Sequence, residues 1–249
     1  APTSRGVQIA YGRGVPDLSG QSLQESRHGP DKLGSPTSWR SLGELEDNVV
    51  RKEFHPPHIY IQETCYFITA SIVGGQWLMR SDAKRALFRD ILRKAVQRWD
   101  VRLFAWVVMD NHYHLLLETG ETEPIYKFVK ALHGDSAVRL NKLDLTPGRH
   151  VWNQYWDRCP RNEREFWTCF NYIHLNPIKH GVVQSVDGVV RVEENAICIA
   201  PGHVPDVHDF LAAYPYSSYH YYVREYGLEF LTDAFLRYPA VDTLACDAF

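Results

Sequence analysis

Two histidines separated by one residue are the first candidates for chemistry in this chain. His112 and His114 lie in a stretch, His112–Glu118, whose residue types suit a β-strand. Successive side chains of a strand point to opposite faces, so both imidazoles project from one face, about 7 Å apart at their Cα atoms. Two ring nitrogens can then bind one metal ion. Histidines also occupy such strands for structural reasons, so the spacing alone leaves both interpretations open.

A tyrosine and an asparagine one helical turn apart form the second candidate pair. A helix is expected from Glu163 to Leu175, and Tyr172 and Asn176 fall together on a different side from its apolar stripe. Pro177 disfavours helical geometry at Asn176, so the helix is expected to end there. The phenol could act as a nucleophile, and the amide oxygen can turn toward a partner. Simple packing and helix capping explain the pair equally well.

The elements that must position these residues follow from the hydrophobic pattern. They are a strand over Ile59–Val73, a helix over Ser81–Trp99, a strand over Leu103–Met109, a turn at Asp110–Asn111, a strand over His112–Glu118, a helix over Pro124–Leu143, an edge strand over Val151–Asp157, a helix capped by Asn162, and a last helix over Leu228–Leu236. This order predicts an α+β fold: an antiparallel sheet of the split βαβ, ferredoxin-like kind, with helices packed on it.

Two motifs together resemble one family. Residues 104–117 read FAWVVMDNHYHLLL, and residues 172–181 read YIHLNPIKHG. In this order they resemble the single-tyrosine HUH transposases, most closely the REP-associated tyrosine transposases. The resemblance spans residues 57–184, with a weaker similarity at 214–219.

The resemblance implies a role for each candidate. His112, His114 and Asn176 would hold a divalent metal, Mg²⁺ or Mn²⁺, and Tyr172 would be the nucleophile. The implied activity is metal-dependent cleavage and transfer of single-stranded DNA through a 5′-phosphotyrosine, acting on hairpin or palindromic repeats.

The chain departs from the family pattern at two positions. Asp110 stands where proline is common, and His180 stands where alanine is usual. Neither change removes an expected ligand, but both bear on the local geometry.

Basic side chains are the expected contacts with DNA phosphates. The candidates are Arg85, Arg89, Arg93, Arg158, Arg161 and Lys179. The first three recur every fourth residue on one side of a helix, where a merely solvated face is the competing explanation. The tail tyrosines after residue 213 could stack on unpaired bases or pack on the core.

Composition narrows the class of protein. The 249 residues are 45% hydrophobic and 23% charged, which is ordinary globular usage, and no apolar run approaches the roughly 18 residues that span a bilayer. Five scattered cysteines indicate neither a disulfide framework nor a zinc knuckle. We expect a cytoplasmic protein without a membrane partner, either a monomer or a homodimer.

Charge and residue composition divide the chain into three parts. We expect a flexible or docking extension over residues 1–55, a catalytic domain over 56–190, and an acidic, aromatic-rich extension over 191–249 that packs on the core. Residues 61–190 carry 17 Lys and Arg against 14 Asp and Glu, and residues 191–249 carry three against nine. The mildly basic middle permits phosphate binding without demonstrating it.

Two other functions remain open at this level. A ferredoxin-like sheet also serves non-catalytic nucleic-acid-binding modules, although no RNP1 pattern is present. Another HUH nickase, such as a relaxase, is the other alternative, but a tyrosine that follows the histidines fits the transposase order better.

Overall fold

The computed structural model describes residues 65–99, 101–119, 125–181, 190–193, 196–199 and 203–241. The expected extension over residues 1–55 and the start of the first expected strand lie outside these residues. No helix in the described ranges combines the length and apolar character needed to cross a membrane.

The central sheet has the expected topology. Its strands are β1 (Cys65–Ser71), β2 (Val101–Val108), β3 (His112–Thr119) and β4 (Trp156–Arg158), in the spatial order β2-β3-β1-β4. Strand β3 pairs antiparallel with both β1 and β2, so β1 and β2 run in the same direction on either side of it. The helix α1 (Asp82–Arg98) joins them. This is the split βαβ arrangement, and it confirms the predicted α+β class.

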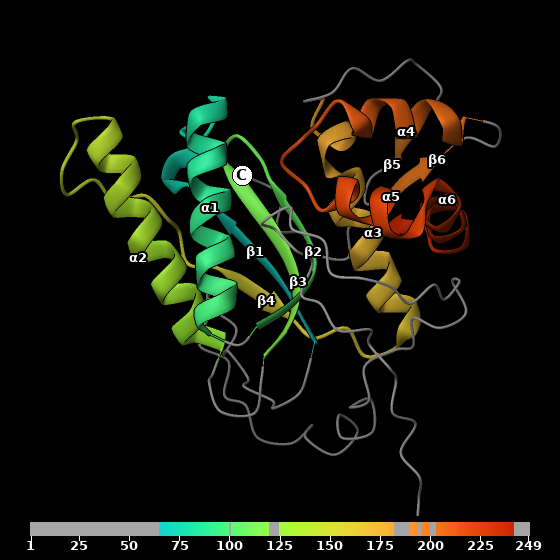
Figure 1. Ribbon diagram of the computed structural model, residues 1–249, viewed down its shortest axis with the longest axis horizontal. Coiled ribbons are helices and arrows are strands. Elements are labelled where there is room, and N and C mark those ends of the chain that lie inside the picture. Colours follow the sequence, from blue (N-terminus) through green and yellow to red (C-terminus); the bar gives the residue numbers. More distant parts are fainter. Residues whose placement is uncertain are drawn as a thin grey trace, which may run out of the picture.

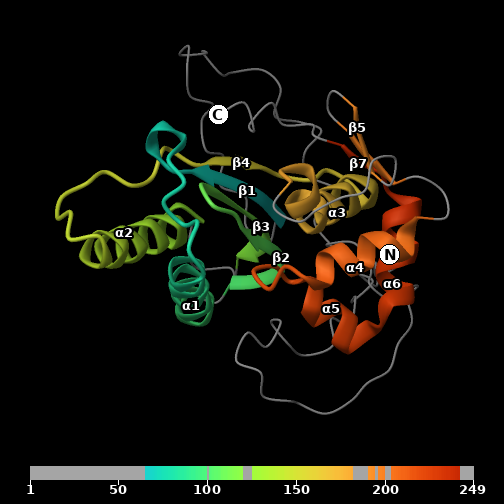
Figure 2. The same ribbon diagram turned by 90° about the horizontal axis from the view of Figure 1, so that it is seen from above.

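Helices cover both faces of this sheet (Figures 1 and 2). Helix α1 and helix α2 (Ile125–Leu143) pack together on one face, and α3 (Glu163–Lys179) lies on the other. Beyond α3 lie α4 (Val204–Ala212), α5 (Tyr219–Tyr226) and α6 (Leu228–Arg237). Because both faces are covered, seven of the eight residues of β2 are buried, and its sequence is a nearly continuous apolar run.

The hairpin between β2 and β3 forms where the sequence predicts it. The N–H of Met109 donates to the carbonyl of His112 at 2.8 Å, and Asp110 and Asn111 make the turn. A two-residue turn fixes the register, and with it the face on which His112 and His114 project.

The segment after α4 extends the sheet at the free edge of β2. The N–H of Val108 donates to the carbonyl of Tyr216, and the N–H of Ser218 donates to the carbonyl of Trp106, both at 2.9 Å. Four of the tail tyrosines are buried, namely Tyr214, Tyr216, Tyr219 and Tyr222. These four pack on the core, so base stacking is the wrong interpretation for them.

A smaller sheet lies at the C-terminal end of the chain. It consists of β5 (Val190–Glu193), β6 (Ala196–Ile199) and β7 (Ala240–Val241), paired antiparallel in that order. The hydrophobic pattern does not predict this sheet, because two of its strands are only four residues long and one is only two.

The structure corrects the expected ends of two strands and one helix. The first strand ends at Ser71, and a 3-10 turn, η2 (Val73–Gly75), follows it. The edge strand β4 has only three residues, preceded by an isolated bridge between Ile72 and Trp152.

Helix α3 is the third case, because it continues past Pro177 to Lys179. The proline removes one N–H donor, but the N–H of His180 still donates to the carbonyl of Asn176 at 3.0 Å. Ile178 is buried, so packing of the last turn offsets the missing bond.

Candidate active site

Strand β3 places two imidazoles on the face that α3 covers. The ring centroids of His112 and His114 are 4.9 Å apart. Tyr113, between them in sequence, points the other way and contacts Phe88 of α1 with ring centroids 5.0 Å apart. The alternation expected for a strand is therefore present.

His114 is held by the neighbouring strand β1. Thr69 is its register partner, and the Thr69 hydroxyl lies 2.8 Å from Nδ1. Phe67 stacks on the ring at a centroid distance of 5.6 Å. Because Nδ1 contacts the hydroxyl, Nε2 is the nitrogen that a metal would bind.

Helix α3 brings the second candidate pair to the same place. Asn162 caps its first turn by accepting a hydrogen bond from the N–H of Glu165 at 2.9 Å. One turn before its end, Oδ1 of Asn176 lies 3.2 Å from Nε2 of His112. The ring of Tyr172 meets the ring of His114 edge-on, with centroids 5.4 Å apart.

The environment keeps both imidazoles neutral. Burial lowers the pKa of His112 to about 3, and repulsion from His180 and Lys179 adds to this shift. Burial and then repulsion from His112 lower the pKa of His114 well below its usual value. A neutral ring with a lone pair on one nitrogen is the form that binds metals.

The contacts of His112 give a test of whether a cation fits. Its Nδ1 lies 2.7 Å from Oδ1 of Asn111, and its Nε2 faces Oδ1 of Asn176. A neutral ring has a single N–H. The shorter contact assigns that hydrogen to Nδ1, so the Nε2 lone pair faces an oxygen lone pair. A cation bound between Nε2 and Oδ1 would turn this repulsion into two coordinate bonds.

The donor set therefore fits a divalent cation. It comprises one nitrogen each of His112 and His114 and the amide oxygen of Asn176. In the part of the chain that the structure describes, no three His, Cys, Asp or Glu side chains are placed to hold a metal. The buried Nδ2 of Asn176 has no hydrogen-bond partner among the described residues.

The hydroxyl of Tyr172 has a cationic neighbour. Nζ of Lys179 donates to the phenolic oxygen at 2.7 Å and lies 4.8 Å from the ring centroid. The ring of Phe67 meets the same ring edge-on, with ring centroids 6.0 Å apart. The sequence provides the lysine, but only the helix geometry shows that it reaches the phenol.

The two departures from the family pattern both have structural roles. Asp110 forms an ion pair with Arg85, which ties α1 to the β2–β3 turn. His180 is the C-cap of α3 and packs its ring 4.8 Å from that of His112. Gly181 follows with φ of 62°, the left-handed conformation that commonly ends a helix.

Comparison with known proteins finds one matching family model. Residues 76–176 match the family model described as transposase IS200 like. This segment is similar to the IS200-like transposases. The matched residues include every candidate ligand and the candidate nucleophile.

Individual proteins that are similar to this chain carry more specific names. The REP-associated tyrosine transposase of Escherichia coli (strain K12) is 24% identical over 131 residues, which cover 51% of this chain and 74% of that protein. A solved REP-associated tyrosine transposase, bound to a REP hairpin, superposes with a TM-score of 0.51 at 19% identity. That match covers 70% of this chain and 89% of the other, and it shows the shared fold.

The six basic candidates fall on two faces of the central sheet. Arg85, Arg89 and Arg93 belong to α1, on the face opposite Tyr172. Arg85 is engaged within the protein: besides Asp110 it contacts Asp82 at 2.8 Å.

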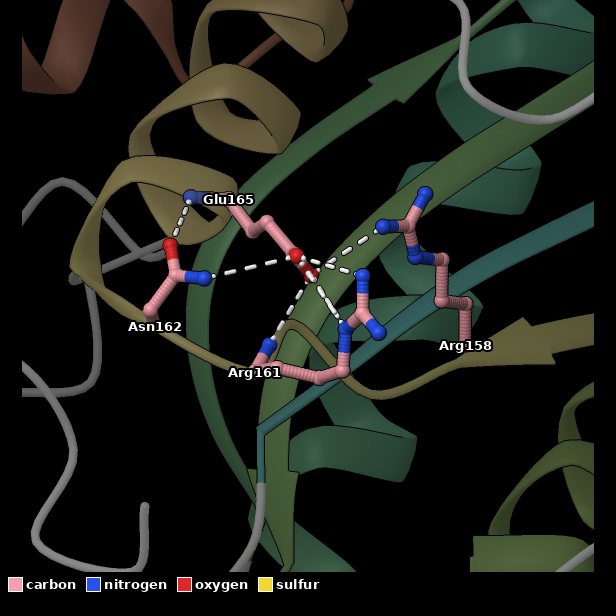
Figure 3. A network of polar contacts seen from close by, with 4 residues as sticks. All are labelled: Arg158, Arg161, Asn162 and Glu165. Carbon is pink, nitrogen blue, oxygen red and sulfur yellow. Dashed lines mark hydrogen bonds and ion pairs between the residues drawn. The ribbon is translucent and has the colours of Figure 1, made fainter. Parts of the chain in front are cut away.

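The other three candidates lie on the α3 side. Arg158 is the register partner of Phe67, so its side chain leaves the sheet on the face of Tyr172. Figure 3 shows Arg158 and Arg161 converging on Glu165, with Nη2–Oε distances of 3.0 Å from each. Lys179 completes this group next to the phenol.

Two residues that orient the histidines were not anticipated. Thr69 belongs to β1, and only the strand register brings it to His114. Asn111 directly precedes His112, and its sequence position was explained by the turn alone.

Proposed function

We propose that this chain cleaves and rejoins single-stranded DNA at hairpin or palindromic repeat elements, through a covalent link to Tyr172. The observation that carries the proposal is the convergence of Tyr172, His112, His114 and Asn176 from β3 and α3 on one face of the sheet. The family match and the hairpin-bound relative support the substrate class.

The chemistry assigned to Tyr172 is attack on a phosphodiester. The bond between Oη and phosphorus forms, the bond from phosphorus to the 3′ oxygen breaks, the phenol gives up its proton, and the departing oxygen takes one up. The products are a 5′-phosphotyrosine and a free 3′-hydroxyl. A divalent cation, Mg²⁺ or Mn²⁺, would when bound neutralise the charge that develops on the phosphate. His112, His114 and Asn176 would hold it.

The basic side chains are proposed to bind the DNA backbone in two groups. Arg158, Arg161 and Lys179 lie on the side of Tyr172 and would contact the strand that enters the site. On α1, Arg89 and Arg93 would contact DNA that passes around the sheet, whereas Arg85 is engaged with Asp82 and Asp110.

A labelling experiment tests the proposal directly. Hairpin oligonucleotides with randomised single-stranded flanks are incubated with the protein and Mn²⁺, and labelled either at the 3′ or at the 5′ end. We expect the 3′ label to become attached to the protein and the 5′ label to appear in a shorter, free strand. Tyr172→Phe, which removes one oxygen atom and keeps the ring, should form no adduct.

The outcomes separate this function from the alternatives. An adduct that persists in Tyr172→Phe would contradict the proposed nucleophile. Hairpin binding that is independent of metal and unchanged in His112→Ala, with no adduct, would instead indicate a non-catalytic binding module.

A further inference from the structure

We propose that Lys179 is the positioning residue of Tyr172: its ammonium group holds the phenolic oxygen on the side of His112 and Asn176 and stabilises the phenolate that departs when strands are rejoined. The inference rests on the proposed function for its second part. Its first part, the hold on the phenol, stands on the geometry alone.

The contact is built into a single helix. Tyr172 and Lys179 are seven residues apart, which is close to two full turns, so both project from the same side of α3. Asn176 lies between them on that side. The 2.7 Å bond from Nζ to Oη therefore joins two residues of the same helix.

The surroundings of the phenol leave its ring little freedom. Tyr172 is buried, His114 meets its ring edge-on, and Phe67 contacts it edge-on from β1. With the ring fixed, the orientation of the hydroxyl remains to be set. An ammonium group has three donors and no acceptor, so Oη accepts from Lys179 and must direct its own hydrogen elsewhere.

The charge of the ammonium group also reaches the imidazoles of His112 and His114. Its charge contributes to the lowered pKa of both His112 and His114, which places it within electrostatic reach of both rings. A phosphate attacked by Tyr172 would lie in this region. Lys179 would therefore face the negative charge of the reacting group as well as the phenol.

Lys179 has a defined part in the rejoining step. The 3′ oxygen of the incoming strand forms a bond to phosphorus and releases its proton to solvent, and the bond from phosphorus to Oη breaks with its electron pair on Oη. A donated hydrogen bond from Nζ is strongest to this phenolate.

The test compares three variants. Lys179→Met removes the donor and the charge, Lys179→Arg keeps both, and Lys142→Met makes the same change at an exposed position on α2, on the opposite face of the sheet. Circular dichroism melts show whether each variant is folded. If Lys179→Met does not fold, Lys179→Gln takes its place.

The first measurement needs no DNA and no metal. With 3-fluorotyrosine at position 172, we expect the ¹⁹F resonance to move in Lys179→Met, to move back toward the original position in Lys179→Arg, and to stay in place in Lys142→Met. An unchanged resonance in folded Lys179→Met would overturn the positioning contact.

The second measurement is the rate of rejoining from the isolated covalent adduct. We expect Lys179→Met to lower kcat for rejoining roughly tenfold to a hundredfold, which is the loss expected for one charged hydrogen bond. The KM for the incoming strand should stay within about threefold of the parent value. Lys179→Arg should restore most of the lost rate. A higher KM with unchanged kcat would overturn the stabilising role and leave only a phosphate contact. A moved ¹⁹F resonance in a protein that forms no adduct on any hairpin would instead refute the proposed function while the contact stands.

Discussion

Thr69 determines which nitrogen of His114 is available to a metal. Its hydroxyl lies 2.8 Å from Nδ1, it is 1% exposed, and it reaches the ring from the neighbouring strand. Groups that contact the second nitrogen of a metal-binding histidine fix its tautomer and its orientation. The metal affinity of the site should therefore depend on a residue that never touches the metal.

We expect Thr69→Val, which replaces the hydroxyl with a methyl group, to weaken Mn²⁺ binding roughly tenfold to a hundredfold. Titration followed by the Mn²⁺ electron paramagnetic resonance signal measures this. Thr119→Val is the matched control, because Thr119 is a buried threonine at the far end of β3 whose hydroxyl has no hydrogen-bond partner among the described residues. Equal affinities for the two variants would show that Thr69 does not orient His114.

Some residues of the site can be predicted from the sequence, and others cannot. His112 and His114 form a short-range pair, and Tyr172 and Asn176 form another, so local period alone predicts that each pair shares a face. Whether the two pairs meet depends on packing α3 against β3. Thr69 illustrates the limit: its role comes from the register between β1 and β3, which no local pattern encodes.

Among the elements, α3 is tied to the edge of the sheet by a polar contact through Ser218. The Ser218 hydroxyl donates to Nε2 of His174 at 2.8 Å and accepts from the N–H of Trp106 at 3.0 Å. Nδ1–H of His174 donates to the carbonyl of Phe170, which leaves Nε2 as the acceptor. One hydroxyl thus joins the tail segment, the edge of β2 and the helix of the proposed nucleophile.

Ser218→Ala should lower the free energy of unfolding by about 1–3 kcal/mol, because it leaves a buried ring nitrogen and a buried N–H unsatisfied. Urea denaturation followed by tryptophan fluorescence measures it. Ser81→Ala serves for comparison: Ser81 is exposed at the N-cap of α1 without a side-chain capping bond, and its replacement should change stability by less than about 0.5 kcal/mol. A cost for Ser218→Ala no larger than this would show that the contact is dispensable.

Elements were predicted well where period and turn chemistry act locally. The hairpin follows from the apolar run of β2 and the Asp110–Asn111 turn, and α1 follows from its amphipathic stripe. The helix end at Pro177 was misjudged because tertiary burial of Ile178 outweighs a local preference. The pairing of the tail with β2 is non-local and could not be read from either segment alone.

At the scale of the whole molecule, buried histidines couple folding to pH. Burial lowers the pKa of His133 on α2 to about 3, and the ring is stacked on Trp152 and contacts the hydroxyl of Tyr113 at 2.8 Å. In the unfolded chain the same ring takes up a proton near pH 6.5. Between about pH 6.5 and pH 3 the unfolded state therefore binds the extra proton, and stability falls as pH falls.

We expect His133→Gln, which retains a polar partner for Tyr113, to flatten this dependence by up to about 1.4 kcal/mol per pH unit across that interval. Urea titrations at successive pH values give the slope. The exposed His150 provides the control, since His150→Gln leaves the interior unchanged. A slope that is the same for the parent protein and His133→Gln would mean that His133 takes up its proton equally in both states.

The division of basic side chains between two faces makes a prediction about the path of DNA. Removing one phosphate-binding side chain should reduce the slope of log affinity against log salt by about 0.7 to 0.9. If a strand runs only along α3, Arg158→Gln with Arg161→Gln should lower the slope, and Arg89→Gln with Arg93→Gln should leave it unchanged. If the hairpin also passes around the sheet to α1, both pairs should lower it.

The proposed use of both groups requires the second result, measured by fluorescence anisotropy on a hairpin with a single-stranded flank. Arg237→Gln is a suitable control, because Arg237 lies on α6 and pairs with Asp233 at 2.7 Å. Only the pair on the side of Tyr172 should also change the rate of adduct formation at saturating DNA, since only that pair lies on the face of the reacting phosphate. A slope insensitive to the α1 pair would confine the bound DNA to the α3 face and remove Arg89 and Arg93 from the interface.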